Sequence, residues 1–271
     1  MLWRSMFPTA ALLGCALALS VAATPVRAQQ VRVVPDDAWC DDDEEDRYCE
    51  VREVTIAADR DVVRVDAAPN GGISVEAWDR NEILLRARVQ AHADSESDAR
   101  DLVGQVNLET GGTIGAEGPR TGHDEWWSVS YELRVPRRSS LDLKSLNGGI
   151  SIDGVSGDIE FHTTNGGIKL AGLAGDISGS TRNGGLTVEL SGDHWDGAGL
   201  DVQTTNGGVK LMIPEGYSAR LESGTTNGSI QVDFPITLQG RIDRKITATL
   251  GDGGPTIRLF TTNGSVAIRK S

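Results

Sequence analysis

The chain has 271 residues and a formal net charge of −13 at pH 7, which argues against binding to nucleic acid or to an anionic membrane surface, because both present negative charge. Apolar residues make up 38% of the chain and aromatic residues 5%, whereas glycine occurs 33 times. This composition is lean for a thick core but sufficient for a thin one built from Val, Ile and Leu, so the length allows one large all-β domain or two small ones.

Residues 1–28 have the features of a secretory signal peptide. A basic residue near the start precedes an apolar run over Ala10–Ala23, and Val26–Ala28 supplies the small residues that a signal peptidase accepts. The apolar run is too short to indicate a membrane span, and we expect no transmembrane segment in the mature chain.

A second interpretation of the same segment is a lipoprotein signal. Leu12–Cys15 is similar to a lipoprotein cleavage box, which would make Cys15 the lipidated N-terminus. The apolar run continues well past Cys15, whereas lipidation sites lie at the end of such runs, so we favour the cleaved signal peptide. With either signal we expect an exported protein that is periplasmic, on the cell surface or secreted.

Two cysteines remain after such a cleavage, Cys40 and Cys49, in an acidic segment over residues 29–52. In an exported protein two cysteines so close in sequence predict a disulfide, which contributes about 2–3 kcal/mol by closing a short loop. Zinc is not expected, because no histidine lies nearby.

The loop between these cysteines is a run of acidic residues, which we interpret as solvated. A weak calcium site is the alternative, since hard cations bind clustered carboxylates. Calcium loops alternate their ligands along the chain, whereas consecutive acidic side chains point in different directions. The candidate ligands are Asp41, Asp42, Asp43, Glu44, Glu45 and Asp46.

Residues 53–136 predict a β-rich region with one helix. Short segments such as Val54–Ile56 and Ile83–Ala87 are rich in β-branched and apolar residues. Asp94–Val103 begins with helix-capping residues and early acids and places its apolar residues on one helical face. A further strand is expected over Trp126–Val135, where the following proline ends it.

Residues 137–271 contain a repeat marked by Asn-Gly. Each Asn-Gly pair is followed, three and five residues after the asparagine, by Ile, Leu or Val with a mostly polar residue between them. The preceding strand alternates in the same way, and a Gly-Asp turn closes each unit. This period of two predicts strands with one buried face. We expect a structural role at the turns for Asn147, Asn165, Asn183, Asn206, Asn227 and Asn263, and for the earlier outlier Asn70.

Two all-β folds fit this repeat. Asn-Gly is a strong turn signal because both residues tolerate positive φ, so a meander of hairpins with type I′ turns is one possibility. The other is a β-solenoid with about 18–23 residues per coil, in which equivalent residues stack at the interstrand distance. The near-constant period, with a last interval of about two units, and the like-on-like columns favour the solenoid. Its asparagine column can form a side-chain hydrogen-bond ladder.

These features resemble the bacterial extracytoplasmic DUF4097 family of β-strand repeat proteins, also called putative adhesins. The resemblance covers roughly Glu53–Ser271. It rests on Asn70–Gly72 followed by Ile73–Trp78, on the acidic helix around Asp98–Val103, on Leu133–Pro136 leading into Leu141–Leu143, and on the serial Asn-Gly repeats. The resemblance implies an all-β repeat fold at the cell envelope and no catalytic residues. The acidic loop between the two cysteines is not part of the pattern.

We expect a non-catalytic module without a cofactor that presents a solenoid face to a glycan or an envelope protein. The sequence contains no zinc-protease, nucleophile-elbow, P-loop or dinucleotide fingerprint. Exposed indoles stack on sugar rings and anchor interfaces, and the candidate ligand contacts are Trp126, Trp127 and Trp195. Because Trp126 and Trp127 alternate on a strand, we expect at least one of them in the core.

Two alternatives belong to other classes. A carbohydrate-active β-helix lyase or hydrolase requires paired catalytic carboxylates, but Asp153, Asp158 and Asp176 lie near turns, where aspartate serves turn geometry. An ice-binding array is the other alternative, but it requires two parallel rows of threonine on one flat face. Its column would be Thr163, Thr181, Thr204, Thr225 and Thr261.

Overall fold

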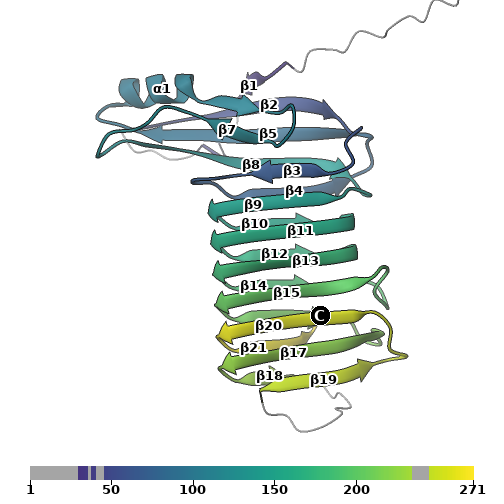
Figure 1. The fold of residues 1–271 in the computed structure, drawn as a ribbon. Coiled ribbons are helices and arrows are strands. Elements are labelled where there is room, and N and C mark those ends of the chain that lie inside the picture. The colour runs from purple at the N-terminus through teal and green to yellow at the C-terminus, as the bar shows by residue number, and fades with distance from the viewer. Residues whose placement is uncertain (1–29, 36–37, 41–45, 234–243) are drawn as a thin grey trace, which may run out of the picture.

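A computed structural model describes residues 30–35, 38–40, 46–233 and 244–271 (Figure 1). The predicted signal segment, Cys15 and the candidate calcium ligands from Asp41 to Glu45 lie outside these ranges. The described chain consists mainly of strands in two large sheets that face each other along a tall stack, with the N-terminal strands and a helix at one end.

The larger sheet, here called sheet A, has 11 strands. In spatial order they are β1 (Arg32–Val34), β2 (Arg47–Ala57), β5 (Glu82–His92), β8 (Trp126–Pro136), β4 (Ile73–Trp78), β10 (Ile150–Asp153), β12 (Ile168–Ala171), β14 (Leu186–Glu189), β16 (Val209–Ile213), β21 (Val266–Lys270) and β18 (Ile230–Val232). Sheet B has 8 strands, in the order β19 (Lys245–Leu250), β17 (Ala219–Asn227), β20 (Thr256–Asn263), β15 (Gly199–Asn206), β13 (Ala174–Asn183), β11 (Ser156–Asn165), β9 (Leu141–Asn147) and β3 (Val63–Asp66).

Each coil of the stack contributes one strand to each sheet, joined by an Asn-Gly corner. β11 and β12 form one coil and β13 and β14 the next, and both strand pairs between these coils are parallel. Equivalent residues are directly opposite each other, as in Asn165 with Asn183 and Ile168 with Leu186. A hairpin meander would pair its strands antiparallel, so the prediction of a β-solenoid is confirmed and the meander is wrong.

The first coil of the stack comes from the region that precedes the serial repeats. β3 pairs with β9 and β4 with β10, both parallel, and Asn70 lies opposite Asn147. β8 then continues sheet A parallel to β4, whereas β5, β2 and β1 extend it antiparallel. The stack therefore starts at Val63 and includes Asn70, the apparent outlier of the repeat.

The inner face of these added strands is covered by the helix α1 (Glu96–Gln105) and by the hairpin of β6 (Asn107–Glu109) and β7 (Gly115–Glu117). The Ser95 hydroxyl caps the helix by accepting from the Asp98 amide. Leu102 and Val103 are buried against β2 and β5, and the Arg52 guanidinium donates to the Val103 carbonyl at 2.7 Å. These elements close the end of the core.

The C-terminal coil does not lie at the end of the stack. β20 pairs with both β15 and β17, and β21 pairs with both β16 and β18, so the last strands of the chain lie between two earlier coils. After β18 the chain returns through β19, which pairs antiparallel with β17. The long interval between Asn227 and Asn263 is thus a reversal of direction, and our interpretation of it as two successive units is wrong.

The first glycine of each corner is required by close stacking rather than by its backbone dihedral. Among the described residues every positive φ belongs to a glycine, and the glycines that follow the repeat asparagines are not among them. A Cβ atom at Gly166 would lie 2.1 Å from the Gly148 carbonyl oxygen, and one at Gly184 would lie 2.0 Å from that of Gly166. Our explanation of Asn-Gly by positive φ is therefore wrong.

The asparagine side chains form a continuous hydrogen-bond ladder along the corners. In the middle of the stack Asn165 Nδ2 donates to Asn147 Oδ1, and Asn183 Nδ2 to Asn165 Oδ1, each at 2.8 Å. The ladder starts with Asn147 donating to Asn70 at 3.0 Å and ends with Asn227 donating to Asn263 at 2.8 Å. Each asparagine side-chain amide thus makes a hydrogen bond with the next one along the surface of the protein.

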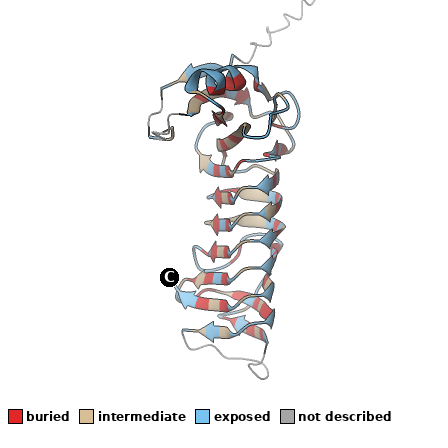
Figure 2. Ribbon diagram, turned by 90° about the vertical axis from the view of Figure 1, so that its left-hand side faces the viewer, coloured by how far each residue is buried: buried red, intermediate tan, exposed pale blue. Residues whose placement is uncertain are grey.

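A second ladder runs inside the corner, formed by the buried threonines. Thr163 Oγ1 donates to the Gly148 carbonyl and Thr181 Oγ1 to that of Gly166, each at 2.8 Å. Thr204, Thr225 and Thr261 make the same bond to their neighbouring coils. All five are at most 5% exposed, so they cannot contact ice, and the ice-binding alternative is wrong. Figure 2 shows that buried residues occur in the strands throughout the stack.

Deleting one whole coil tests this architecture. Removing Asn165–Arg182 joins Thr164 to Asn183, keeps the apolar columns in register and loses one layer of neighbouring contacts. We expect a cooperative melt by circular dichroism with a modest decrease in Tm. Removing Asn165–Leu173 deletes half a coil, reverses the sheet assignment of the following strands and exposes their apolar face. That variant should aggregate or melt without cooperativity, and equal tolerance of both deletions would contradict the solenoid.

Two adjacent threonines provide a matched test of the buried ladder. Thr204→Val removes the hydroxyl that donates to the Gly184 carbonyl at 2.8 Å and should lower the free energy of unfolding by about 1–2 kcal/mol, because the carbonyl loses its partner. Thr205→Val changes an exposed residue of the same strand and should have an effect within about 0.5 kcal/mol. Urea unfolding of both variants measures the two changes in the free energy of unfolding. Equal changes would exclude a stabilising role for the ladder.

Candidate functional site

A shallow groove of about 510 Å³ lies on the outer face of sheet A near the N-terminal end of the stack. Residues alternate between the two faces of a strand, so the polar residue between the two buried apolar residues of each repeat points outward. These outward residues form a column across four strands, and the groove is lined by Ser74, Ser151, Lys169 and Thr187 together with Ser130, Glu132 and Trp39.

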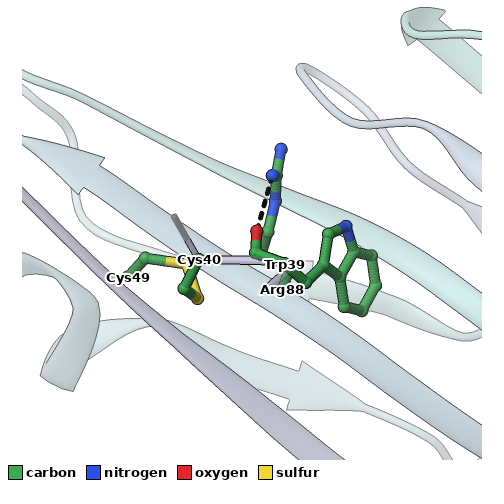
Figure 3. The surroundings of a disulfide bond; sticks show 4 residues. All are labelled: Trp39, Cys40, Cys49 and Arg88. Atoms are coloured by element: carbon green, nitrogen blue, oxygen red, sulfur yellow. Dashed lines mark hydrogen bonds between the residues drawn. A yellow bond between two sulfur atoms is a disulfide. The ribbon is translucent and has the colours of Figure 1, made fainter. Parts of the chain in front are cut away.

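Trp39 is fixed at this groove by covalent and polar contacts. The neighbouring residue Cys40 forms a disulfide with Cys49 of β2, with 5.6 Å between their Cα atoms. Arg88 of β5 donates from Nη1 to the Trp39 carbonyl at 2.9 Å. Figure 3 shows the disulfide on one side of the Trp39 backbone and the indole on the other. The short segment before β2 is therefore held across the sheet with its indole at the groove.

Two arginines of β5 support the indole. The guanidinium carbons of Arg86 and Arg88 lie 5.3 Å and 5.8 Å from the centre of the Trp39 ring, within the range of cation–π attraction. Arg86 also donates to the Glu132 carboxylate at 2.6 Å. Arg86 and Glu132 thus form an ion pair within the groove.

Lys169 is the cation of the groove that makes no ion pair or hydrogen bond with any described residue. Tyr131 lies below the surface, and its pKa is raised mainly by burial and also by the negative charge of Asp66. Its phenol therefore remains neutral and packs in the core. The groove thus offers hydroxyl groups, one free ammonium group and one indole.

The tryptophans predicted from the sequence lie elsewhere. Trp195 is 4% exposed and donates from Nε1 to the Gly175 carbonyl at 3.0 Å, so its interpretation as a ligand contact is wrong. Trp127 is half-buried, packs against the core and donates to the Pro119 carbonyl at 2.9 Å. Trp126 stacks on His92 with 6.0 Å between ring centres. Neither Trp126 nor Trp127 lines the groove.

Of the candidate calcium ligands, Asp46 alone is described. Its carbonyl accepts from the Ala93 amide at 3.1 Å, and the described residues contain no cluster of three or more His, Cys, Asp or Glu side chains suited to a metal ion. The calcium hypothesis therefore rests on the sequence of the acidic run.

A second hollow of about 350 Å³ lies beside the loop that follows β2. Arg60, Asp61, Arg138 and Ser140 are among its lining residues, and Arg60 donates to the Gly112 carbonyl at 2.8 Å. Asp61 is its one lining carboxylate, as Glu132 is in the groove. Neither hollow, as lined by described residues, offers the carboxylate pair of a glycosidase.

Residues 137–269 match the model of the family described as Toastrack DUF4097. No curated protein matches the chain. A putative cell adhesion protein from Clostridium sporogenes is 7% identical over 83% of this chain and 100% of its own, with a TM-score of 0.46. A putative adhesin from Bacteroides fragilis is 10% identical over 83% and 97%, with a TM-score of 0.42. A putative lipid binding protein from Parabacteroides distasonis is 12% identical over 82% and 96%, with a TM-score of 0.33.

Breaking the disulfide tests how Trp39 is held. The double variant Cys40→Ser, Cys49→Ser should unfold with a free energy lower by about 2–3 kcal/mol, because a short loop is no longer closed in the unfolded chain. Non-reducing mass spectrometry of the exported wild-type protein should show no alkylatable thiol at either cysteine. Two free thiols there, or a variant as stable as the wild type, would contradict the structural role of this bond.

Proposed function

Residues 137–269 belong to the Toastrack DUF4097 family, and from this premise we propose that the chain is a non-catalytic binding module of the bacterial cell envelope. We place its ligand, a carbohydrate chain, in the groove on the outer face of sheet A. The observation that carries this proposal is the clamped indole of Trp39 beside a column of hydroxyl groups.

The chemistry of the groove suits a sugar polymer. A pyranose ring has an apolar face, which stacks on an indole, and hydroxyl groups at its edge, which bond to polar side chains. Ser74, Ser151 and Thr187 present hydroxyl groups on successive or nearby coils, and coils repeat at about 4.8 Å. A repeating ligand can thus make repeated contacts along the stack.

The rigidity of the solenoid favours binding. Both hydrogen-bond ladders fix the position of each coil, and the disulfide and Arg88 fix Trp39. A site that is ordered before the ligand arrives loses less conformational entropy on binding. This preorganisation is of use to a module that holds a flexible polysaccharide.

Export to an oxidising compartment agrees with this role. The Cys40–Cys49 disulfide is typical of extracytoplasmic proteins, and the sequence predicts a signal segment before it. In the described part of the chain no helix has the length and apolar character to cross a membrane. From the disulfide and the predicted signal segment we place the site outside the cytoplasm, where envelope glycans are accessible.

Replacing Trp39 tests the proposal. On an array of soluble bacterial and host glycans the wild-type protein should bind a defined subset, and Trp39→Ala should weaken that binding by about tenfold or more, as loss of a central aromatic anchor does. Trp78→Ala is the matched control, because Trp78 lies on the same sheet but does not line the groove. It should bind as the wild type does.

Three outcomes would contradict the proposal. Binding to no glycan while an envelope protein is captured would favour a protein ligand. If the wild type and Trp39→Ala bound the glycans with equal affinity, the binding site would lie outside the groove. Release of reducing ends from a bound polysaccharide would show catalysis and revive the enzyme alternative.

A further inference from the structure

The Asn-Gly corners that build the stack are also sites of intrinsic chemical reactivity. In an Asn-Gly sequence the backbone nitrogen of glycine can attack the side-chain carbonyl carbon of asparagine. The new N–C bond closes a succinimide ring, the C–Nδ2 bond breaks, and Nδ2 leaves as ammonia with the proton of the attacking amide. Water then opens the ring to aspartate or isoaspartate. This reaction requires no reactant other than water.

Six of the seven Asn-Gly corners have their attacking nitrogen occupied. The amide of the first glycine donates to the carbonyl of the asparagine in the next coil, for example Gly166 to Asn183 at 2.9 Å and Gly184 to Asn206 at 3.0 Å. The same bond is made by Gly71, Gly148, Gly207 and Gly264. Attack at these corners requires the bond to open first.

Gly228 differs because its coil is the last in the stack. Asn227 lies on β17, which has no further asparagine corner beyond it in sheet B. Among the described residues no acceptor receives the Gly228 amide. Gly228 is also exposed, whereas the equivalent glycines of the other six corners are buried or half-buried. The side chain of Asn227 is held by one ladder bond, as donor to Asn263 at 2.8 Å.

We infer that Asn227 is a deamidation site, and that the stacking of coils protects the other six asparagines from the same reaction. The product carboxylate has no hydrogen to donate, so the bond to Asn263 Oδ1 is replaced by a contact between two acceptors. An isoaspartate also inserts an extra backbone atom between β17 and β18, which alters the register of the last coil. The reaction thus loosens the end of the stack and leaves the groove at the other end intact.

Peptide mapping tests this inference with six internal controls. The full mature protein is incubated at mildly alkaline pH, where the attacking amide is more readily deprotonated, and digested at intervals for mass spectrometry. Asn227 should convert about tenfold or more faster than Asn165 and Asn183, because those corners react only after local opening. In concentrated urea all seven sites should convert at comparable rates, since the flanking glycine is the same.

A second measurement follows the consequence of the reaction. Asn227→Asp should lower the Tm slightly, as should the naturally converted protein, while glycan binding by the groove is unaffected. Equal rates at Asn227 and Asn165 in the folded protein would overturn the inference. Faster conversion at an internal corner would also overturn it, because the stacking bonds would then offer no protection.

Discussion

The stack depends on how closely one Asn-Gly corner lies on the next. At each corner a carbonyl oxygen of one coil lies close to the first glycine of the neighbouring coil. A Cβ atom on that glycine would be only about 2 Å from the oxygen, so no other residue fits there. This close approach lets the threonine hydroxyl reach the same carbonyl and lets the asparagine amides bond to one another. Glycine, threonine and asparagine are therefore required together at each corner, and the rest of the coil follows the register that they set.

This constraint explains how a thin, aromatic-poor core can be stable. The two apolar residues after each corner stack on like residues of neighbouring coils. In every coil except the terminal one of β18 they are nearly inaccessible to solvent, as Ile150 and Ile168 are. A large side chain is accommodated by a small neighbour: a Cβ atom at Gly179 would lie 2.2 Å from the Phe161 ring. Ordered stacking also leaves the outward residues in straight columns, which is why a polar groove forms on sheet A.

The sequence predicted the repeats, the helix and the disulfide, but it missed the order of the last coils and the position of Trp39. The alternation after each asparagine identified the buried columns and the ladder because every coil has the same pattern. The same uniformity concealed the order of the coils. Val266 and Ile268 are apolar residues that could pack in any coil, so no residue near β20 and β21 indicates that these strands lie between two earlier coils. Trp39 has no periodic context, and its position depends on a disulfide and on two arginines distant in sequence.

Trp195 shows the converse error. It lies in a loop among polar residues, which suggested exposure, but a carbonyl of another coil accepts its indole hydrogen and permits burial. The chain thus has a scaffold of repeating coils, which the spacing of apolar residues predicts. The helix, the disulfide and the groove lie at the N-terminal end of this scaffold. Function is proposed at that end because the structure departs from repetition there.

Hydrogen exchange at the corners tests the central claim most directly. Nuclear magnetic resonance can follow the exchange of individual backbone amide hydrogens with solvent. If close stacking holds the coils together, the amide hydrogens of Gly166 and Gly184 should exchange only as fast as global unfolding permits. The amide of Gly228, which has no acceptor among the described residues, should exchange orders of magnitude faster. Rapid exchange at all three glycines would show that the corners open independently and would contradict the account.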